Sequence, residues 1–459
     1  MATGVPKTRW NGELATGIAS GGLDVSLSYK GKRTEAEILA TEPGQVEPLY
    51  QGADDEKRLY YGDNLPILAT LLQDPTIRGR VRLVYIDPPF ATGSVFKSRS
   101  QKDAYADLLA GAQYLEFIRQ RLVLLRELLA DDGSIYVHLD ANMAFHIKVI
   151  MDEVFGARNF RNWITRKKCN PKNYTRKTYG NVSDYILFYT RSNSYVWHRP
   201  CAPWTPAQIE KEYPCIEEET GRRYKKVPVH APGVRKGATG GPWRGMLPPA
   251  GKHWQYTPER LNGMDDRGEI YWSPTGNPRR KVYLDESPGI PVQDIWLDFR
   301  DAHNQNVRIT GYPTEKNPDL LALIIKGSSN PGDLVLDCFA GSGTTLAVAD
   351  QLGRKWIGID NSPQAIATTL KRFAIGTQPM GDFVSKRKKA RREKTDTPRR
   401  TLFDFYGVDV QPPQEEQPEG ITFEKEHLIS DFSLFCLAGT TNDVVDALSQ
   451  WKASLQATA

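Results

Sequence analysis

Two short groups of residues have side chains suited to chemistry, and the first is Asp87-Pro88-Pro89-Phe90, directly after the apolar run 83–86. Consecutive prolines stiffen the chain where it leaves a strand and remove two backbone donors, so that their carbonyls serve as fixed acceptors. A carboxylate, a rigid carbonyl and an aromatic face within four residues can hold an exocyclic amino group while the Phe90 ring stacks on the base. The alternative is a turn that ends a strand, with an incidental phenylalanine.

The second group is Asp-Cys-Phe-Ala-Gly-Ser-Gly-Thr-Thr at 337–345, between a predicted strand and a predicted helix. Gly341 and Gly343 let a ligand approach the backbone, and the helix N-terminus offers free N–H groups. Asp360, at the end of the next strand, can accept hydrogen bonds from ribose hydroxyls. The pattern predicts a nucleoside-containing cofactor, with tight strand–helix packing as the alternative. Leu346 replaces the third glycine of a dinucleotide fingerprint and no Gly-Lys-Ser/Thr follows, which disfavours NAD and ATP.

The elements around these two groups alternate between short apolar runs and helical periodicity. Strands are predicted at 83–86, 134–138, 186–189, 334–338 and 355–360, and helices at 114–129, 142–155, 318–326 and 344–352. This alternation predicts an α/β fold with a mostly parallel sheet. Between about 158 and 312 the regularity fails, and Pro, Gly, Trp, Tyr and Arg become frequent. We interpret this segment as an irregular domain inserted into the α/β body.

Charge is unevenly distributed along the 459 residues, whose net charge is +5. Residues 404–459 contain ten acidic and two basic side chains, so this tail carries −8 and residues 1–403 carry +13. A basic body favours a polyanionic partner. No apolar run approaches the roughly 20 residues of a membrane span, and the start of the chain lacks a signal pattern. The five cysteines form no C-x-x-C pair, so neither a zinc site nor a disulfide framework is expected.

Taken together, Asp-Pro-Pro-Phe and the downstream Asp-x-Phe-x-Gly-Ser-Gly-Thr-Thr resemble the motifs of DNA amino-methyltransferases that use S-adenosylmethionine. Their order resembles the beta-class permutation, in which the insert is the target recognition domain. Thr314-Glu315-Lys316-Asn317-Pro318 resembles the family's element that closes over the methionine end of the cofactor, and Gly62-Asp63-Asn64 its strand-end element. The resemblance covers residues 58–373 and implies a Rossmann-like methyltransferase sheet.

The resemblance also implies roles for individual residues. The catalytic residues would be Asp87, Pro88, Pro89 and Phe90. The cofactor-binding residues would be Asp63, Asp87, Thr314, Lys316, Asp337, Phe339, Gly341, Ser342, Gly343, Thr344 and Asp360. Two positions depart from the usual family pattern: Asp360 stands where glutamate is more frequent, and Phe90 replaces the commoner tyrosine. The shorter side chain of Asp360 should still reach a ribose hydroxyl. Phe90 should still stack on the base, although it lacks the phenol hydroxyl of tyrosine.

The chemistry implied by the resemblance is direct in-line transfer of a methyl group to an exocyclic amine of a base flipped out of duplex DNA. Aspartate at the first position of the tetrapeptide favours adenine N6 as the target. Cytosine N4 is the runner-up, and a catalytically inactive DNA-binding module is a second alternative. RNA or protein methylation stays open as well. Methylation at cytosine C5 is rejected because the candidate nucleophile Cys215, which follows a proline, lies in the insert.

The insert supports a DNA partner, because residues 158–177 contain eight basic side chains and no acidic one. Basic side chains contact phosphates, and some of them can read bases. The candidate DNA-binding residues are Lys167, Lys168, Arg176, Lys177, Trp243 and Arg244. The seven histidines show no metal-binding spacing, so no metal is predicted.

The expected organisation divides the chain into six parts. They are an N-terminal arm (1–50), the catalytic half of the methyltransferase domain (51–157), the target recognition insert (158–312), the cofactor-binding half (313–380), a basic linker (381–403) and an acidic C-terminal tail (404–459). A strand near 183–190 is compatible with the core sheet. The expected partners are double-stranded DNA, a second copy in a homodimer and a restriction subunit. The expected location is the cytoplasm of a bacterium or archaeon, or a phage-infected cell.

Overall fold

The computed structural model describes residues 25–89, 95–97, 103–106, 111–170, 177–301, 308–379, 428–440 and 443–458. The chain forms two compact units. One consists of residues 199–292, and the described residues on both sides of this segment form the other. Among the helices of these described residues, none combines the length and the apolar character needed to cross a membrane.

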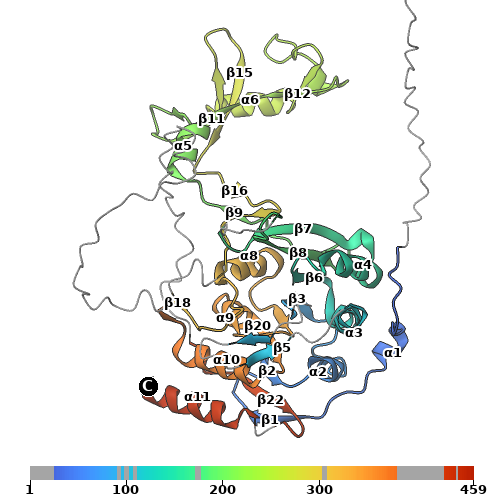
Figure 1. The fold of residues 1–459 in the computed structure, drawn as a ribbon. Helices are drawn as coiled ribbons and strands as arrows, with labels where there is room; N and C mark the ends of the chain where they lie inside the picture. The colour runs from blue at the N-terminus through green and yellow to red at the C-terminus, as the bar shows by residue number, and fades with distance from the viewer. Residues whose placement is uncertain are drawn as a thin grey trace, which may run out of the picture. The chain divides into compact units, whose positions relative to one another are not determined.

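The larger unit is built on a ten-stranded sheet (Figure 1). Its order is β1 (Val46–Tyr50), β22 (Ser433–Leu437), β2 (Lys57–Tyr61), β20 (Lys355–Asp360), β19 (Leu334–Asp337), β3 (Val81–Ile86), β6 (Leu129–Leu139), β8 (Ser183–Thr190), β7 (Phe160–Lys167) and β17 (Ile295–Trp296). All neighbours from β22 to β6 are parallel, whereas β8 is antiparallel to both β6 and β7. The Rossmann-like, mostly parallel sheet is thereby confirmed.

Helices cover both faces of this sheet. Figure 1 shows α2 (Asn64–Leu71), α3 (Ala112–Leu128) and α4 (Ala144–Phe155) on one face, and α8 (Pro318–Ser328), α9 (Thr344–Gln351) and α10 (Pro363–Ile375) on the other. Each helix turns an apolar stripe toward the sheet; on α3 the buried residues include Ile118, Leu122 and Leu125, at the spacing that predicted this helix. The core therefore lies between two helical layers and the sheet, and the loops at the strand ends are available for a site.

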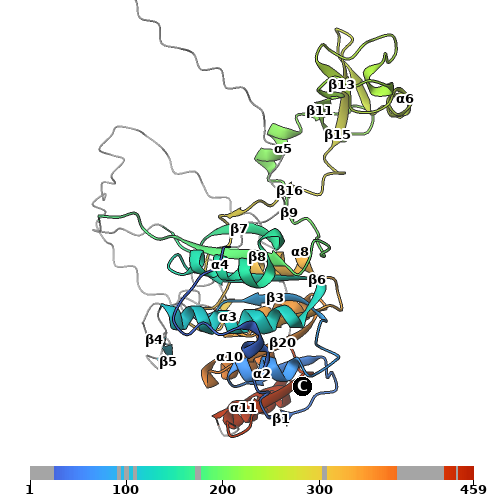
Figure 2. The same ribbon diagram turned by 90° about the vertical axis from the view of Figure 1, so that its right-hand side faces the viewer.

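Both ends of the described chain pack onto this body. On the N-terminal side, a capping box between Thr34 and Glu37 starts α1 (Glu35–Leu39), and Ile38 is fully buried in the core. On the C-terminal side, β22 and α11 (Val445–Thr458) bring Phe432 against the rings of Trp356 and Phe373. Figures 1 and 2 both place β1 and α11 at the same end of the unit. Part of the segment predicted as an acidic tail thus belongs to the core.

Residues 199–292 form a unit with its own small core. Its strands are β9 (Cys201–Ala202), β10 (Cys215–Ile216), β11 (Arg223–Pro228), β12 (His230–Pro232), β13 (Lys252–Trp254), β14 (Ile270–Trp272), β15 (Pro278–Tyr283) and β16 (Ile290–Pro291), and its helices are α5 (Pro206–Glu212) and α6 (Pro258–Asp266). Trp243, Trp254 and Leu261 are buried among them. This unit is narrower than the predicted insert 158–312, because β7, β8 and β17 are strands of the large sheet.

The remaining short strands are β4 (Val95–Lys97) paired with β5 (Asp103–Ala106), and β18 (Arg308–Ile309) paired with β21 (Gln378–Pro379). The first pair follows the Asp-Pro-Pro-Phe tetrapeptide in the chain. The second joins the segment before α8 to the residues that follow α10, and so anchors the chain between β18 and α8 beside the carboxyl edge of the sheet.

Candidate active site

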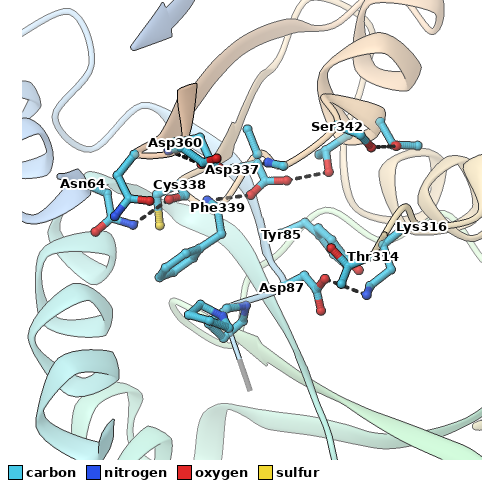
Figure 3. A pocket seen from close by; sticks show the side chains of 18 of the residues that line it. Asn64, Tyr85, Asp87, Thr314, Lys316, Asp337, Cys338, Phe339, Ser342 and Asp360 are labelled. Atoms are coloured by element: carbon cyan, nitrogen blue, oxygen red, sulfur yellow. Dashed lines mark hydrogen bonds and ion pairs between the residues drawn. The ribbon is translucent and has the colours of Figure 1, made fainter. Parts of the chain in front are cut away.

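A cavity of about 330 Å³ opens at the carboxyl ends of β2, β20, β19 and β3 (Figure 3). Parallel strands end at the same sheet edge, so their terminal side chains meet there. Of the predicted residues, the lining includes Asp63, Asp87, Pro88, Pro89, Thr314, Lys316, Asp337, Phe339, Gly341, Ser342, Thr344 and Asp360. Both motif groups thus contribute to one cavity. Phe90 lies outside the described residues.

Residues 338–343 connect β19 to α9 and form the glycine-rich loop, whose two glycines have different tasks. Both have positive φ, +54° at Gly341 and +70° at Gly343. Gly341 lines the cavity, and its N–H donates to Oδ2 of Asp360 at 2.8 Å. Gly343 is not among the lining residues, and a Cβ there would lie 2.7 Å from Cγ2 of Thr369 on α10. Ligand approach therefore concerns Gly341, whereas Gly343 permits close packing of the loop against a helix.

Two buried carboxylates flank this loop. Asp337 accepts hydrogen bonds from the N–H of Phe339 (3.0 Å) and from Oγ1 of Thr345 (2.6 Å), and burial raises the pKa of its carboxyl to about 7. Burial also raises the pKa of Asp360, although backbone N–H groups, that of Ser362 included, oppose the shift. Each of these oxygens keeps lone pairs that can accept from ribose hydroxyls or from a cationic ligand.

Asp63 is held by residues that the sequence analysis did not single out. Its carboxylate caps α2 by accepting from the N–H of Leu65, and it pairs with Nη2 of Arg121 at 2.9 Å. Arg121 is buried, also donates to Asn64, and has its guanidinium 3.5 Å from the Phe117 ring centroid. Burial lowers the pKa of Arg121 to about 10. The helical spacing of α3 could not predict that Arg121 holds Asp63, because it shows only that Phe117 and Arg121 are neighbours one turn apart.

Asp87 is the carboxylate of the Asp-Pro-Pro-Phe tetrapeptide and has two unlike oxygens. Oδ2 forms an ion pair with Nζ of Lys316 at 2.6 Å, as Figure 3 shows. Oδ1 is buried and has no hydrogen-bond partner. A buried, unpaired acceptor is costly in a folded protein and is found where a ligand or a reaction needs it. The Asp87 side chain is thus held in place through Oδ2, whereas Oδ1 has no hydrogen-bond partner.

The segment that carries Thr314 and Lys316 is tied to the glycine-rich loop. Arg372 on α10 donates from Nε to the Ser342 carbonyl at 2.8 Å and from Nη2 to Oγ1 of Thr344 at 3.0 Å. The same guanidinium pairs with Glu315, whose other oxygen accepts from the N–H and hydroxyl of Thr310. Asn317 then caps α8. Lys316 consequently reaches Asp87 from a segment with little freedom.

The predicted DNA-binding residues in the larger unit have unlike surroundings. Lys168 pairs with Oδ1 of Asp184 at 2.9 Å, and that carboxylate is buried, so Lys168 faces into the protein. Lys167 ends β7 and is partly exposed, whereas Lys177 is exposed. Arg176 lies outside the described residues. Of this group, Lys167 and Lys177 offer surface charge.

In the unit of residues 199–292, Trp243 is 1% exposed and its indole donates to Asn262. Its ring is a core residue and is inaccessible to DNA, which corrects the sequence-based expectation. Arg244 is half-exposed and pairs with Asp265 at 2.6 Å. Trp243 stacks on the partly buried Trp272 and makes an edge contact with Trp254, and it packs with Val229, Leu261, Met264 and Ile270 in this small core.

The family model for N6/N4 DNA methylases matches residues 81–371, and the chain belongs to this family. Its cofactor is S-adenosylmethionine. The cavity fits this cofactor in kind: four carboxylates, those of Asp63, Asp87, Asp337 and Asp360, face a ligand that carries a sulfonium and an ammonium group, and Phe339 adds an aromatic face.

Individual relatives support the same family. The chain is 47% identical over 402 residues to the type II methyltransferase M.EcaI of Enterobacter cloacae, covering 84% of this chain and 87% of that one. It is 28% identical over 327 residues to the Mod subunit of the type III restriction-modification enzyme StyLTI of Salmonella typhimurium, covering 62% and 48%. The M1.HpyAVI–SAM complex aligns with 69% of this chain and 98% of that chain, at 16% identity and a TM-score of 0.38.

Proposed function

We propose that this protein transfers a methyl group from S-adenosylmethionine to the N6 amine of an adenine flipped out of duplex DNA. One observation carries the proposal: the buried and unpaired Oδ1 of Asp87, next to the rigid carbonyl of Pro88 in the cofactor cavity. An aspartate at this position favours adenine over cytosine. The name of one relative points the same way, since residues of this chain are 37% identical over 121 residues to the DNA adenine methyltransferase YhdJ of Escherichia coli.

In this proposal, Asp87 and the Pro88 carbonyl accept the two hydrogen bonds of the target amine. An amine conjugated to a purine ring is a poor nucleophile, and two acceptors favour a pyramidal nitrogen whose lone pair is directed at the methyl donor. The cofactor, when bound, supplies an electrophilic methyl group on a sulfonium. Lys316 holds the Asp87 carboxylate by its other oxygen, so that the acceptor is oriented before the amine arrives. Phe90 stacks on the flipped base.

The remaining lining residues are assigned to the cofactor. Asp360 accepts from ribose hydroxyls, and Asp337 and Phe339 lie beside it on the glycine-rich loop. Asp63, held by Arg121, lines the cavity from the end of β2. Thr314 and Lys316 also line the cavity, on the segment that Arg372 ties to the loop.

We assign target recognition to the unit of residues 199–292. Its paired strands β11 and β15 carry Lys225, Lys226, Arg279 and Arg280, and Arg279 is exposed. Such side chains contact phosphates in a salt-dependent manner. With Lys167 and Lys177 on the larger unit, they are the basic residues that we expect to contact DNA. The names of two relatives, a type II methyltransferase and a type III Mod subunit, support the same role for this chain, the modification component of a restriction-modification system. The proposal adds a cytoplasmic location, a homodimer and a restriction subunit as partner.

The test is the identity of the methylated nucleoside. Purified protein is incubated with labelled S-adenosylmethionine and bacterial DNA, and the nucleosides are separated by mass spectrometry. The proposal expects N6-methyladenine; N4-methylcytosine would overturn the adenine assignment while leaving the transferase intact. Asp87→Ala is the control for the site and should transfer no methyl group while still binding the cofactor in calorimetry. DNA binding by the wild type without any transfer would instead support the inactive DNA-binding module.

A further inference from the structure

A row of polar side chains crosses one face of the large sheet behind Asp87. It begins with Tyr85 on β3 and Asp87 directly after that strand, and it continues through His138 on β6 to Asp184 on β8. His138 is fully buried and Asp184 is 3% exposed. Polar groups so deep in a sheet need partners, and their arrangement is therefore specific. The proposed function uses only Asp87 from this row.

The strand register explains why the row is continuous. Tyr85 pairs with Tyr136, so His138, two residues further along β6, is level with Asp87 on the same face. On β8, which runs antiparallel, Ile186 pairs with His138, and Asp184 is again two residues away on that face. The three side chains thus meet at the carboxyl edge of the parallel strands, next to the cofactor cavity.

The partners of His138 define its tautomer. Nδ1 lies 2.8 Å from Oη of Tyr85, and Nε2 lies 3.6 Å from Oδ2 of Asp184. A carboxylate cannot donate, so the ring proton belongs on Nε2, and the tyrosine hydroxyl donates to the lone pair of Nδ1. Burial lowers the pKa of His138, which favours the neutral ring. Burial alone would raise the pKa of Asp184, but the contacts with His138 and Lys168 outweigh it and lower that pKa.

The neutral ring bears directly on Asp87. Nδ1 of His138 lies 4.0 Å from Oδ1 of Asp87, the oxygen without a hydrogen-bond partner. As long as Nδ1 carries no proton, His138 offers this oxygen no donor. A proton on Nδ1 ends its role as acceptor of the Tyr85 hydroxyl, 2.8 Å away. The charged N–H can then turn from Tyr85 Oη toward the carboxylate and form a charge-assisted hydrogen bond with Oδ1 of Asp87.

We propose that His138 is a positioning residue for the methyl transfer: its neutral form leaves Oδ1 of Asp87 free for the target amine, and its protonated form occupies that oxygen. The inference rests on the proposed function, in which Asp87 accepts the amine. Turnover then falls as His138 gains a proton. The groups that face His138 are Tyr85 from β3, Asp87 directly after that strand, Asp184 from β8, Arg166 from β7 and Lys316 from the segment before α8. The two cations oppose the imidazolium and the two carboxylates favour it.

The first test is the pH dependence of kcat at saturating DNA and cofactor. In the wild type we expect kcat to fall on the acid side as one group protonates. His138→Asn keeps an acceptor for the Tyr85 hydroxyl near the place of Nδ1 but does not titrate. In this variant the acid limb should move by about one pH unit or more toward acid. A purely structural role would instead lower kcat or the melting temperature by a similar amount at every pH.

The second test is a titration that does not depend on catalytic activity. The pKa of His138 is followed in the wild type and in Asp87→Asn by NMR of histidine-labelled protein, with His138→Asn or His138→Gln used to assign the signal. If protonated His138 pairs with Asp87, loss of that carboxylate lowers the pKa of His138. An unchanged histidine pKa, or an acid limb of His138→Asn that superimposes on the wild type, would overturn the inference. If Asp87→Ala transfers no methyl group, the proposed function stands even when one of these results overturns the role of His138. If Asp87→Ala still transfers methyl groups, the proposed function itself is overturned.

Discussion

Arg372 and Glu315 form a buried ion pair between α10 and the segment that precedes α8. The pair is the point at which the glycine-rich loop and the Lys316 segment are joined, because the same guanidinium also binds the Ser342 carbonyl. Loop and segment both line the cavity, so this interaction helps to fix the distance between two neighbouring parts of its wall.

Removal of one partner of this pair should be costly. We expect Glu315→Ala to lower the free energy of unfolding by about 3–5 kcal/mol, because it removes the carboxylate that pairs with the buried Arg372 guanidinium. Denaturant titration measures this loss. The double variant Glu315→Leu with Arg372→Met should regain most of the stability, since neither charge remains. Its dissociation constant for S-adenosylmethionine should nevertheless be higher than that of the wild type, because the loop and the segment are no longer joined. A double variant that binds the cofactor as the wild type does would show that the pair only stabilises the fold.

The packing role of Gly343 can be separated from backbone strain. Gly343→Ala introduces a Cβ at φ +70° and 2.7 Å from Thr369, whereas Gly353→Ala introduces one at φ +72° whose nearest neighbour is 4.0 Å away. Strain alone should cost about 1–2 kcal/mol in both variants. We expect Gly343→Ala to lose a further 1–3 kcal/mol, roughly the cost of overpacking. Equal losses in thermal unfolding would contradict the packing role.

The raised pKa of Asp337 predicts a distinct pH dependence. Burial raises the pKa of its carboxyl from 3.8 to about 7. Folding therefore favours the protonated form, so the contribution to stability is full below about pH 4, falls as the pH rises, and is lost above about pH 7. Asp337→Asn stays neutral, and its stability relative to the wild type should increase from pH 4 to pH 8. Asp55→Asn, at an exposed carboxyl, serves as the control in the same melting experiments. A constant difference between Asp337→Asn and the wild type across this range would contradict the shift.

The C-terminal segment should contribute strongly to stability. Phe432 is fully buried and its ring contacts Trp356, Phe373 and Trp451. We expect Phe432→Ala to lower the free energy of unfolding by about 3–5 kcal/mol. Leu428→Ala, at a residue 41% exposed, should change it by less than about 0.5 kcal/mol. Similar values for the two variants in chemical denaturation would show that the segment packs only loosely.

The sequence predicted those parts of the site that are local in the chain. Asp87 directly follows β3 and Asp337 ends β19, and strand ends of a parallel sheet converge, so their meeting could be foreseen. Arg121 and His138 could not be assigned in this way. Each lies within a helix or strand whose apolar pattern only marks it as core, and its partner, Asp63 or Asp184, is brought near by the order and register of the strands.

The same reasoning explains two wrong predictions, the DNA contact of Trp243 and the C-terminal segment as a tail only. Trp243 belongs to a basic, aromatic segment typical of DNA contact, but a unit of this size needs large apolar side chains for its core, and its tryptophans serve there. Residues 433–437 lie in an acidic region, and an acidic composition does not predict a short strand. The neighbours of this strand, β1 and β2, lie near the opposite end of the sequence.

Because β22 separates β1 from β2, the order of synthesis constrains how this sheet is completed. The ribosome delivers residues 433–437 after more than nine-tenths of the chain has been made. Until then, β1 lacks its hydrogen-bonded neighbour and the outer edge of β2 is open. Open strand edges invite pairing with other chains. The nascent protein is therefore most exposed to misassembly before residues 433–437 emerge, and a premature stop ahead of them would leave an open sheet edge that can pair with other chains.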